Sequence, residues 1–398
     1  MVSLKCVILG AGYGKRLRPL TNTRSKLLLP IANKPIIQHI IDTFVTEGIY
    51  EFVIVIGHDL DGLRSYFSKN SQDIKIEYVI QDTIDGTASA VGVVSSHVKG
   101  SFVVVNGDML FDSTFLRLIL HKGGVSMAVS YVEDPTQYGT VDVEGGYITS
   151  ISEKNPKVQS HLANVGIYLL RDEIFSAISK TKKSPRGEYE LTDSLLQLIR
   201  GGKKISAVEC SSWWRDIGRP WDILDANEHY LSILSNSFIL GIIEDGATIL
   251  GPIQLGRGSI IYSGAKVFGP CIIGENSIIR NNSVIRSFTT IGDNCSIGPH
   301  TEIRNSLLMS DVVVSEHSTI FESIIDEHVT IGSGCTISSE RDDKKTIEME
   351  INGVLLDSKR ERLGAVIGSN VTIDKNVVIY PGRKIDSGEN IVSLKTKS

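Results

Sequence analysis

The C-terminal part of the chain carries an aliphatic residue at every sixth position, and no other feature of the sequence restricts the fold as strongly. Twelve apolar residues follow one another at this spacing: Ile243, Ile249, Leu255, Ile261, Val267, Ile273, Ile279, Ile285, Ile291, Ile297, Ile303 and Met309. A globular β domain would alternate apolar and polar residues with a period of two. A period of six predicts a solenoid of hexapeptide repeats, in which each short strand sends one aliphatic side chain inward.

The period slips after Met309, breaks across residues 338–364, and returns from Ile367 to Ile391. The interrupting stretch is polar and charged, so its side chains cannot fill the interior of the coil and it must loop outward. A functional loop and a bland insertion share this composition, and both interpretations stay open.

The N-terminal part has a different pattern, in which Val/Ile-rich runs alternate with segments of helical character such as Lys34–Glu47. The runs up to residue 108 are CVILG, FVIVIG, IKIEYVI and FVVVNGD. This alternation predicts βαβ units and a parallel sheet, whose ligands sit at the carboxyl ends of the strands. We therefore expect two domains, residues 1–236 and 237–398, with an inserted loop at 338–364.

The chain has 41 basic and 46 acidic residues, a formal net charge of −5 and no block of like charges. This charge pattern argues against nucleic acid or an anionic membrane surface as a partner. We found no apolar run of membrane-spanning length and no signal-peptide pattern at the start. The five cysteines are scattered and form no C-x-x-C pair, which argues against a zinc site or a disulfide framework and fits a reducing cytoplasm.

The segment LGAGYGKRLRPLT, directly after the first predicted strand, is the most informative for chemistry. Its glycines allow backbone amides to point at phosphate oxygens, and basic side chains add positive charge, so a polyphosphate is the expected ligand. The candidate nucleotide-binding residues here are Leu9, Gly10, Ala11, Gly12, Gly14 and Lys15, and further cations are Arg16, Arg18 and Lys26. A Gly-rich surface turn with solvated basic residues is the alternative interpretation.

Two familiar phosphate-binding motifs fail on spacing. A dinucleotide fingerprint requires glycine where Lys15 stands, and a carboxylate after the second strand, where Gly57 and His58 stand. A P-loop requires four residues between its glycines and Ser or Thr after the lysine, whereas here three residues intervene and Arg16 follows Lys15.

Asp108 ends the apolar run FVVVNG, so we expect its carboxylate at a strand terminus beside the Gly-rich loop. Mg²⁺ takes few protein carboxylates and completes its shell with phosphate and water. Asp108 and one more acid therefore suffice, and Asp216 in the WRDIG turn is the candidate for the second. An Asp at a strand end is also a common turn former or helix cap.

From Gly10 to Pro30 the chain resembles the sugar-1-phosphate nucleotidylyltransferase family, whose signature has glycines, then Arg, Leu, Pro, Leu and Thr, and then Lys before Pro. The resemblance continues through NGD at 106–108, EK at 153–154, NVG at 164–166 and WRDIGRP at 214–220. With the hexapeptide tail it covers almost the whole chain and is similar to archaeal long forms, some of them bifunctional acetyltransferases. It implies an α/β, Rossmann-like nucleotidyltransferase domain followed by a left-handed parallel β-helix that often trimerises.

The resemblance implies attack by a sugar-1-phosphate oxygen on the α-phosphorus of a nucleoside triphosphate, with release of pyrophosphate and with Mg²⁺ at Asp108 and Asp216. Arg16 would hold the β- and γ-phosphates, and Lys26 the region of the α-phosphate. The sugar phosphate would meet residues from the later motifs: Tyr138, Gly139, Glu153, Lys154 and Asn164. Each of these can also be a surface charge or turn residue.

Base choice would rest on Gln81 and on the run Gly86, Thr87 and Ala88. A side-chain amide offers a donor and an acceptor, which match the O4 and N3–H edge of uracil or thymine. Relatives that use UTP or dTTP carry such a Gln, although a relative that uses ATP does so too, and a solvated loop Gln is the plain alternative. The identity of the sugar stays open.

For the solenoid, the resemblance offers His317 as the general base of an acetyl transfer from acetyl-CoA to an amino-sugar-1-phosphate. Relatives place a Tyr where Ile320 stands and an Asn where Ser339 stands, which counts against this activity. A trimerisation scaffold is the alternative role of the solenoid. A non-catalytic regulatory subunit is the alternative for the whole chain.

Overall fold

The computed structural model describes residues 4–57, 60–70, 73–153 and 160–392. The chain divides into two units. The first comprises Met1–Tyr13, Ser25–Leu28 and Ile36–Asp216, and the second comprises Gly14–Arg24, Leu29–Pro35 and Ile217–Ser398. Two short segments near the N-terminus therefore belong to the second unit.

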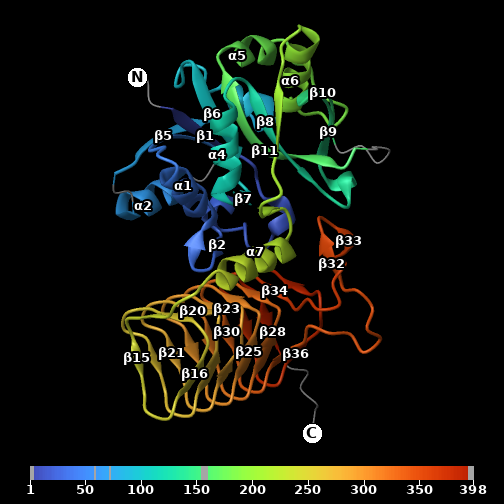
Figure 1. Ribbon diagram of the computed structural model, residues 1–398. Coiled ribbons are helices and arrows are strands. Elements are labelled where there is room, and N and C mark those ends of the chain that lie inside the picture. The colour runs from blue at the N-terminus through green and yellow to red at the C-terminus, as the bar shows by residue number, and fades with distance from the viewer. Residues whose placement is uncertain (1–3, 58–59, 71–72, 154–159, 393–398) are drawn as a thin grey trace. The chain divides into compact units, whose positions relative to one another are not determined.

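The first unit is built on a nine-stranded mixed sheet in the order β5-β4-β1-β6-β11-β8-β12-β10-β9 (Figure 1). The four predicted runs form its parallel half: β1 (Lys5–Leu9), β4 (Glu51–Ile56), β5 (Lys75–Ile80) and β6 (Ser101–Asn106). The other strands are β8 (Ser126–Tyr131), β9 (Gly139–Glu144), β10 (Tyr147–Glu153), β11 (Leu162–Arg171) and β12 (Ser206–Glu209). The predicted Rossmann-like core is confirmed.

Helices form in the segments where apolar residues recur at helical spacing. In α1 (Ile36–Thr46) one buried face is formed by Ile36, Ile37, Ile40, Ile41 and Phe44. The others in this unit are α2 (Leu60–Asn70), α3 (Thr87–Gly92), α4 (Ser113–Lys122), α5 (Glu173–Ile178) and α6 (Leu191–Arg200), with 3-10 turns η2 (Lys26–Leu28) and η3 (Pro135–Gln137). Asp112 caps α4 by accepting a hydrogen bond from the amide of Thr114 at 2.8 Å.

The second unit contains the solenoid, whose short strands form three parallel sheets consistent with a left-handed β-helix. The first sheet comprises β14 (Phe238–Ile239), β17 (Ile253–Leu255), β20 (Cys271–Ile273), β23 (Thr289–Ile291), β26 (Leu307–Leu308), β29 (Ile324–Ile325), β34 (Val366–Ile367) and β37 (Lys384–Ile385). The second comprises β15 (Ile242–Ile243), β18 (Ile260–Ile261), β21 (Ile278–Ile279), β24 (Ser296–Ile297), β27 (Val313–Val314), β30 (Thr330–Ile331), β35 (Thr372–Ile373) and β38 (Asn390–Ile391). The third comprises β16 (Thr248–Leu250), β19 (Lys266–Phe268), β22 (Val284–Ile285), β25 (Glu302–Arg304), β28 (Thr319–Phe321), β31 (Thr336–Ile337) and β36 (Val378–Ile379).

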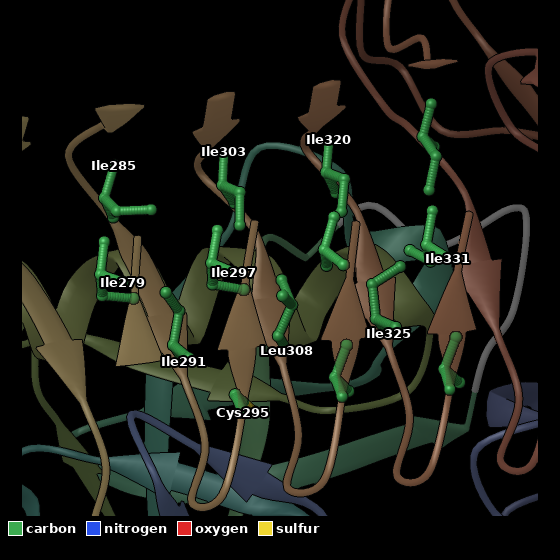
Figure 2. Packing of buried hydrophobic residues seen from close by; sticks show 14 of the residues in the cluster. Ile279, Ile285, Ile291, Cys295, Ile297, Ile303, Leu308, Ile320, Ile325 and Ile331 are labelled. Atoms are coloured by element: carbon green, nitrogen blue, oxygen red, sulfur yellow. The ribbon is translucent and has the colours of Figure 1, made fainter. Parts of the chain in front are cut away.

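The aliphatic residues of the six-residue period fill the interior of the β-helix, as Figure 2 shows for Ile279, Ile285 and Ile291. The last position of the predicted run is wrong by one residue. Leu308 pairs in register with Ile291 and continues the inward stack, whereas Met309 is buried outside that cluster. The step from Ile303 to Leu308 is thus one of five residues, which displaces the period that the sequence shows.

Left-handed backbone at the corners lets the coil turn. At one corner the stacked residues are Gly264, Asn282, His300, His317, Gly334 and Asn376, all with positive φ. Glycine has no Cβ to hinder this conformation, and Asn and His are enriched in it among the other residues. The small or polar residue of each repeat is therefore a turn residue.

The interruption contains a β-hairpin, of β32 (Glu348–Ile351) and β33 (Val354–Asp357), rather than an irregular loop. Asn352 and Gly353 form its turn with φ of 52° and 80°, the two positive values that a two-residue type I′ turn requires. The second unit also contains η1 (Lys15–Leu17), the short pair β2 (Pro30–Ile31) and β3 (Lys34–Pro35), and α7 (Pro220–Ser232).

All five cysteines are buried free thiols, in agreement with the predicted absence of a disulfide framework. Of the described helices, none has both the length and the apolar character that crossing a membrane demands.

Candidate active site

Two glycines at strand ends bring the backbones of the first unit close together. The amide of Gly10, after β1, donates to the carbonyl of Val55 at 2.8 Å, and the amide of Gly107, after β6, donates to that of Leu9 at 2.9 Å. A Cβ on either glycine would overlap the side chain of Leu27. The two glycines therefore form the surface on which Leu27 packs, and this packing fixes the position of Lys26 before it.

Lys26 meets the predicted metal ligand directly. Its Nζ donates to Oδ2 of Asp108 at 2.5 Å, with the lysine side chain only 12% exposed. Asp216 ends the strand β13 (Trp214–Asp216), which pairs antiparallel with β7 (Met109–Phe111), and its partner in register is Met109, the residue after Asp108. The structure therefore brings Lys26, Asp108 and Asp216 to one end of this two-stranded sheet.

The donor set at this point fits magnesium better than a tightly ligated transition metal. Two carboxylates, Asp108 in the turn before β7 and Asp216 at the end of β13, leave most coordination positions to phosphate and water, as Mg²⁺ prefers. In the described part of the chain no group of three or more His, Cys, Asp or Glu side chains is arranged to hold a metal ion.

The Gly-rich loop crosses from the first unit to the second at residue 14. Ala11 is buried and Leu9 half-buried at the end of β1, and a Cβ on Gly12 would have no atom within 4 Å. Gly14 takes the left-handed conformation (φ 60°) and begins the 3-10 turn that carries Lys15 and Arg16. The space beside the Cα of Gly12 is therefore open.

Within the second unit, the guanidinium of Arg16 lies against Gly218, where a Cβ would approach it to 3.4 Å. Lys15 and Arg18 line an open cavity of about 1070 Å³ together with the hairpin β32–β33 and the end of the third sheet. From the sequence, Lys15 and Arg18 were expected to contact only the phosphates of the ligand. The structure adds the inserted segment as their neighbour.

The predicted base-recognition residues are held by backbone contacts in the first unit. Gln81 is 3% exposed, and its Nε2 donates to the carbonyl of Gly86 at 3.2 Å. Gly86 has φ of +139°, and a Cβ there would overlap the backbone of Tyr189. Thr87 accepts a hydrogen bond from the amide of Leu191 at 2.9 Å. Gln81 is therefore an ordered, buried amide rather than the solvated loop residue that the sequence left open.

Of the predicted sugar-side residues, Gly139, Glu153 and Asn164 lie on strands β9, β10 and β11, and Tyr138 directly precedes β9. Gly139 packs against Glu153, since a Cβ there would approach Oε2 to 2.7 Å. Asn164 donates to the hydroxyl of Tyr168 at 2.7 Å, where β11 departs from regular pairing with β8. The ring of Tyr138 meets Trp214 edge to face at 5.3 Å. Lys154, the remaining candidate, lies outside the described residues.

Two charged residues beside Glu153 were missed by the sequence interpretation. Arg186 contacts Glu153 at 3.3 Å and Glu190 at 3.2 Å. Burial raises the pKa of the Glu190 carboxyl, and the nearby Glu153 carboxylate raises it further. The charged run RGEYE before an apolar helix was the available signal for these two residues, but the same composition is typical of a solvated loop.

His317 occupies a corner of the β-helix with φ of 57°, and its exposed ring stacks on that of His300 with centroids 5.0 Å apart. His300, Asn282 and Gly334 hold the equivalent corner positions in neighbouring coils. The turn alone therefore accounts for a histidine here, independently of the catalytic role predicted for it.

Comparisons with known proteins agree with this architecture. The nucleotidyl transferase family model matches residues 5–233, and the model of the GMPPB C-terminal domain matches residues 267–381. The chain is 37% identical over 393 residues to "Bifunctional protein GlmU" of Methanococcus maripaludis, which covers 98% of this chain and 93% of that protein. It is 33% identical over 385 residues to "Bifunctional sugar-1-phosphate nucleotidylyltransferase/acetyltransferase" of Sulfurisphaera tokodaii, with 96% and 94% covered.

A solved structure is similar to the N-terminal part. It is a putative glucose-1-phosphate thymidylyltransferase from Bacillus anthracis in complex with a sucrose, 30% identical with a TM-score of 0.52. The match covers 56% of this chain and 94% of that one.

Proposed function

Because the chain belongs to the nucleotidyl transferase family, we propose that it transfers a nucleotidyl group from UTP or dTTP to a hexose-1-phosphate or an N-acetylhexosamine-1-phosphate and releases pyrophosphate. The observation that carries this proposal is the meeting of Lys26 with Asp108, beside Asp216 at the end of β13. A cation and two carboxylates at one strand end form the constellation that phosphoryl transfer requires, since positioning and charge neutralisation dominate its catalysis.

In the proposed reaction an oxygen of the sugar phosphate forms a bond to the α-phosphorus while the bond from that phosphorus to the bridging oxygen of pyrophosphate breaks. Lys26 holds the α-phosphate oxygens, and Arg16 holds the departing β- and γ-phosphates. A magnesium ion held by Asp108 and Asp216 would neutralise charge on phosphate oxygens. Glu153 accepts hydrogen bonds from sugar hydroxyls, and Asn164 donates a hydrogen bond to a sugar hydroxyl. These bonds orient the attacking phosphate.

The preference for uracil or thymine rests on Gln81. Its Nε2 donates one hydrogen to the carbonyl of Gly86. The second Nε2 hydrogen and the side-chain oxygen of Gln81 would then pair with the edge of the base. The name of the Bacillus anthracis protein supports a thymidylyl donor. The names of the curated relatives support a sugar-1-phosphate as the acceptor.

The proposal is tested by measuring Mg²⁺-dependent pyrophosphate release. The assay crosses UTP, dTTP, ATP, GTP and CTP with the 1-phosphates of glucose, mannose, galactose and N-acetylglucosamine. We expect turnover with UTP or dTTP and at least one of the sugars. Folded protein that is silent with every pair would favour the regulatory-subunit interpretation instead.

Replacing Asp108 by Asn keeps the shape of the side chain but removes its charge. We expect Asp108→Asn to reduce pyrophosphate release at least about a hundredfold, because the metal and Lys26 both lose their anionic partner. Asp142→Asn is the matched control, since Asp142 is an exposed residue of β9. Near-normal turnover in Asp108→Asn would contradict the metal assignment.

A second activity, acetyl transfer from acetyl-CoA to an amino-sugar-1-phosphate, is supported by the names of both curated relatives, each of which is called bifunctional. We infer that His317 would be its general base. Its stacked neighbour His300 provides a matched control. Release of free CoA with glucosamine-1-phosphate should be lost in His317→Ala and retained in His300→Ala, while pyrophosphate release stays unchanged in both.

We also propose that the β-helix mediates a homotrimer or a higher homo-oligomer. Light scattering on the purified chain tests this, and a monomer would contradict it.

A further inference from the structure

An ion-pair cluster joins the segment that follows the Gly-rich loop to the β-helix. Within the second unit, Arg24 donates from Nη2 to Asp326 at 2.7 Å and from Nη1 to Glu327 at 2.8 Å. The Asp326 side chain has no solvent exposure, and that of Arg24 is 13% exposed. The segment Gly14–Arg24 is therefore bonded to the coil through a buried charge.

A second anchor fixes the chain on the other side of Lys26. In the turn between β2 and β3, the side-chain amide of Asn33 donates to the carbonyl of Ile291 at 2.7 Å. Next to it, the amide of Ala32 donates to Oδ1 of Asn227 at 3.0 Å, and this fully buried Asn in α7 donates to the carbonyl of Phe288 at 3.1 Å. In the sequence, the four residues Ser25–Leu28 are therefore flanked by two segments of the second unit that are bonded to its β-helix.

Stability alone does not explain the buried pair. Burial raises the pKa of Asp326 to about 6, and the nearby Glu327 carboxylate also raises it. The Arg24 guanidinium, the backbone amide of Glu327 and His328 lower this pKa, but they do not compensate for burial. Removal from water therefore outweighs the attraction to Arg24, as is common for buried ion pairs. Such pairs are better attested as devices that specify one arrangement of the chain.

We propose that Arg24 is a positioning residue for nucleotidyl transfer: bonded to Asp326 and Glu327, it holds the chain two residues before Lys26 in one arrangement on the β-helix. This inference rests on the proposed function, because it assigns the β-helix a part in that reaction. Arg24 touches no reacting atom and acts only through the placement of Lys26, and of Arg16 earlier in the same segment. Small displacements of such groups reduce rate and binding strongly.

The test compares steady-state kinetics of Arg24→Met, Asp326→Asn and the double variant at pH 7.5. We expect the KM for the nucleoside triphosphate to rise about tenfold in Arg24→Met, a quantity that does not depend on how much enzyme is folded. The double variant should be no worse than Arg24→Met, because both changes remove the same bond. Arg24→Lys, which keeps one charged contact, should recover part of the loss.

The matched control is Arg304→Met, which breaks another ion pair of the β-helix, the one with the largely buried Glu322 at 2.9 Å. It should lower the melting temperature without changing KM. A wild-type protein that is inactive with all substrates would refute the proposed function itself. An active wild type whose KM is unchanged in Arg24→Met, or changed equally in Arg304→Met, would overturn the positioning role.

Discussion

The two glycines in the first unit's part of the Gly-rich loop differ in what surrounds them. A Cβ on Gly10 would overlap Leu27, whereas one on Gly12 would meet no atom within 4 Å. We expect Gly12→Ala to fold like the wild type but to bind UTP about tenfold more weakly, because a methyl group at this position hinders a phosphate that approaches the amide. Isothermal titration with UTP and a thermal melt measure the two effects separately.

Gly10→Ala serves as the comparison. Leu27 must move to admit the methyl group, and Lys26 moves with it, so both stability and turnover should fall. Equal UTP affinity in Gly12→Ala and the wild type would mean that phosphate does not bind at this loop.

At the scale of elements, the corners of the β-helix show why His317 is compatible with its position. Its φ of 57° is unfavourable for a β-branched residue and tolerated by Asn. We expect His317→Asn to leave the free energy of unfolding nearly unchanged, and His317→Val to lower it by about 1–2 kcal/mol. Denaturant unfolding measures the difference, and an equal effect of both substitutions would argue against backbone strain as the cause.

The elements were predictable where one period governs them. The parallel strands and α1 follow from runs of Val and Ile and from helical spacing, and the β-helix follows from the six-residue repeat. The hairpin β32–β33 was not predicted, because its Asn352–Gly353 turn lies inside a charged stretch whose composition is that of a loop. The five-residue step to Leu308 was missed since Met309 is equally apolar and continues the period in the sequence.

The candidate site was predictable as far as each residue carries a local signal. Asp108 stands at a strand end and Lys26 follows a Gly-rich loop. In the structure Nζ of Lys26 lies 2.5 Å from Oδ2 of Asp108. Arg186 and Glu190 carry only the ambiguous signal of a charged run, because their role depends on contact with Glu153, which lies more than thirty positions away.

At the scale of the whole molecule, the segment Gly14–Arg24 belongs with the β-helix although the chain order places it in the nucleotide-binding domain. Within that unit Arg24 bonds to Asp326, a residue 302 positions further along the chain. No local pattern encodes a contact at this separation. Its effect on the molecule should nevertheless be visible in the pH dependence of both stability and activity.

For stability, the sign follows from the raised pKa of Asp326, about 6 in the folded protein against an ordinary value near 3.9. Because the folded state holds this proton more tightly than the unfolded chain, protonation stabilises the fold. That contribution is fully present below pH 4 and is lost as the pH rises through 6. Asp326→Asn, which is neutral at every pH, should therefore gain stability relative to the wild type between pH 4 and 7, by about 3 kcal/mol at most.

Activity should move in the opposite direction over the same range. The carboxylate forms above pH 6, and only then does Arg24 gain its buried partner, so the wild-type KM for the nucleoside triphosphate should fall as the pH rises from 5 to 7 and stay flat in Asp326→Asn. Melting curves and KM values measured at half-unit intervals test both effects on the same two proteins. A stability difference between the two proteins that does not depend on pH would contradict the raised pKa of Asp326. The same dependence of KM on pH in both proteins would mean that the charge of Asp326 does not affect the placement of Lys26.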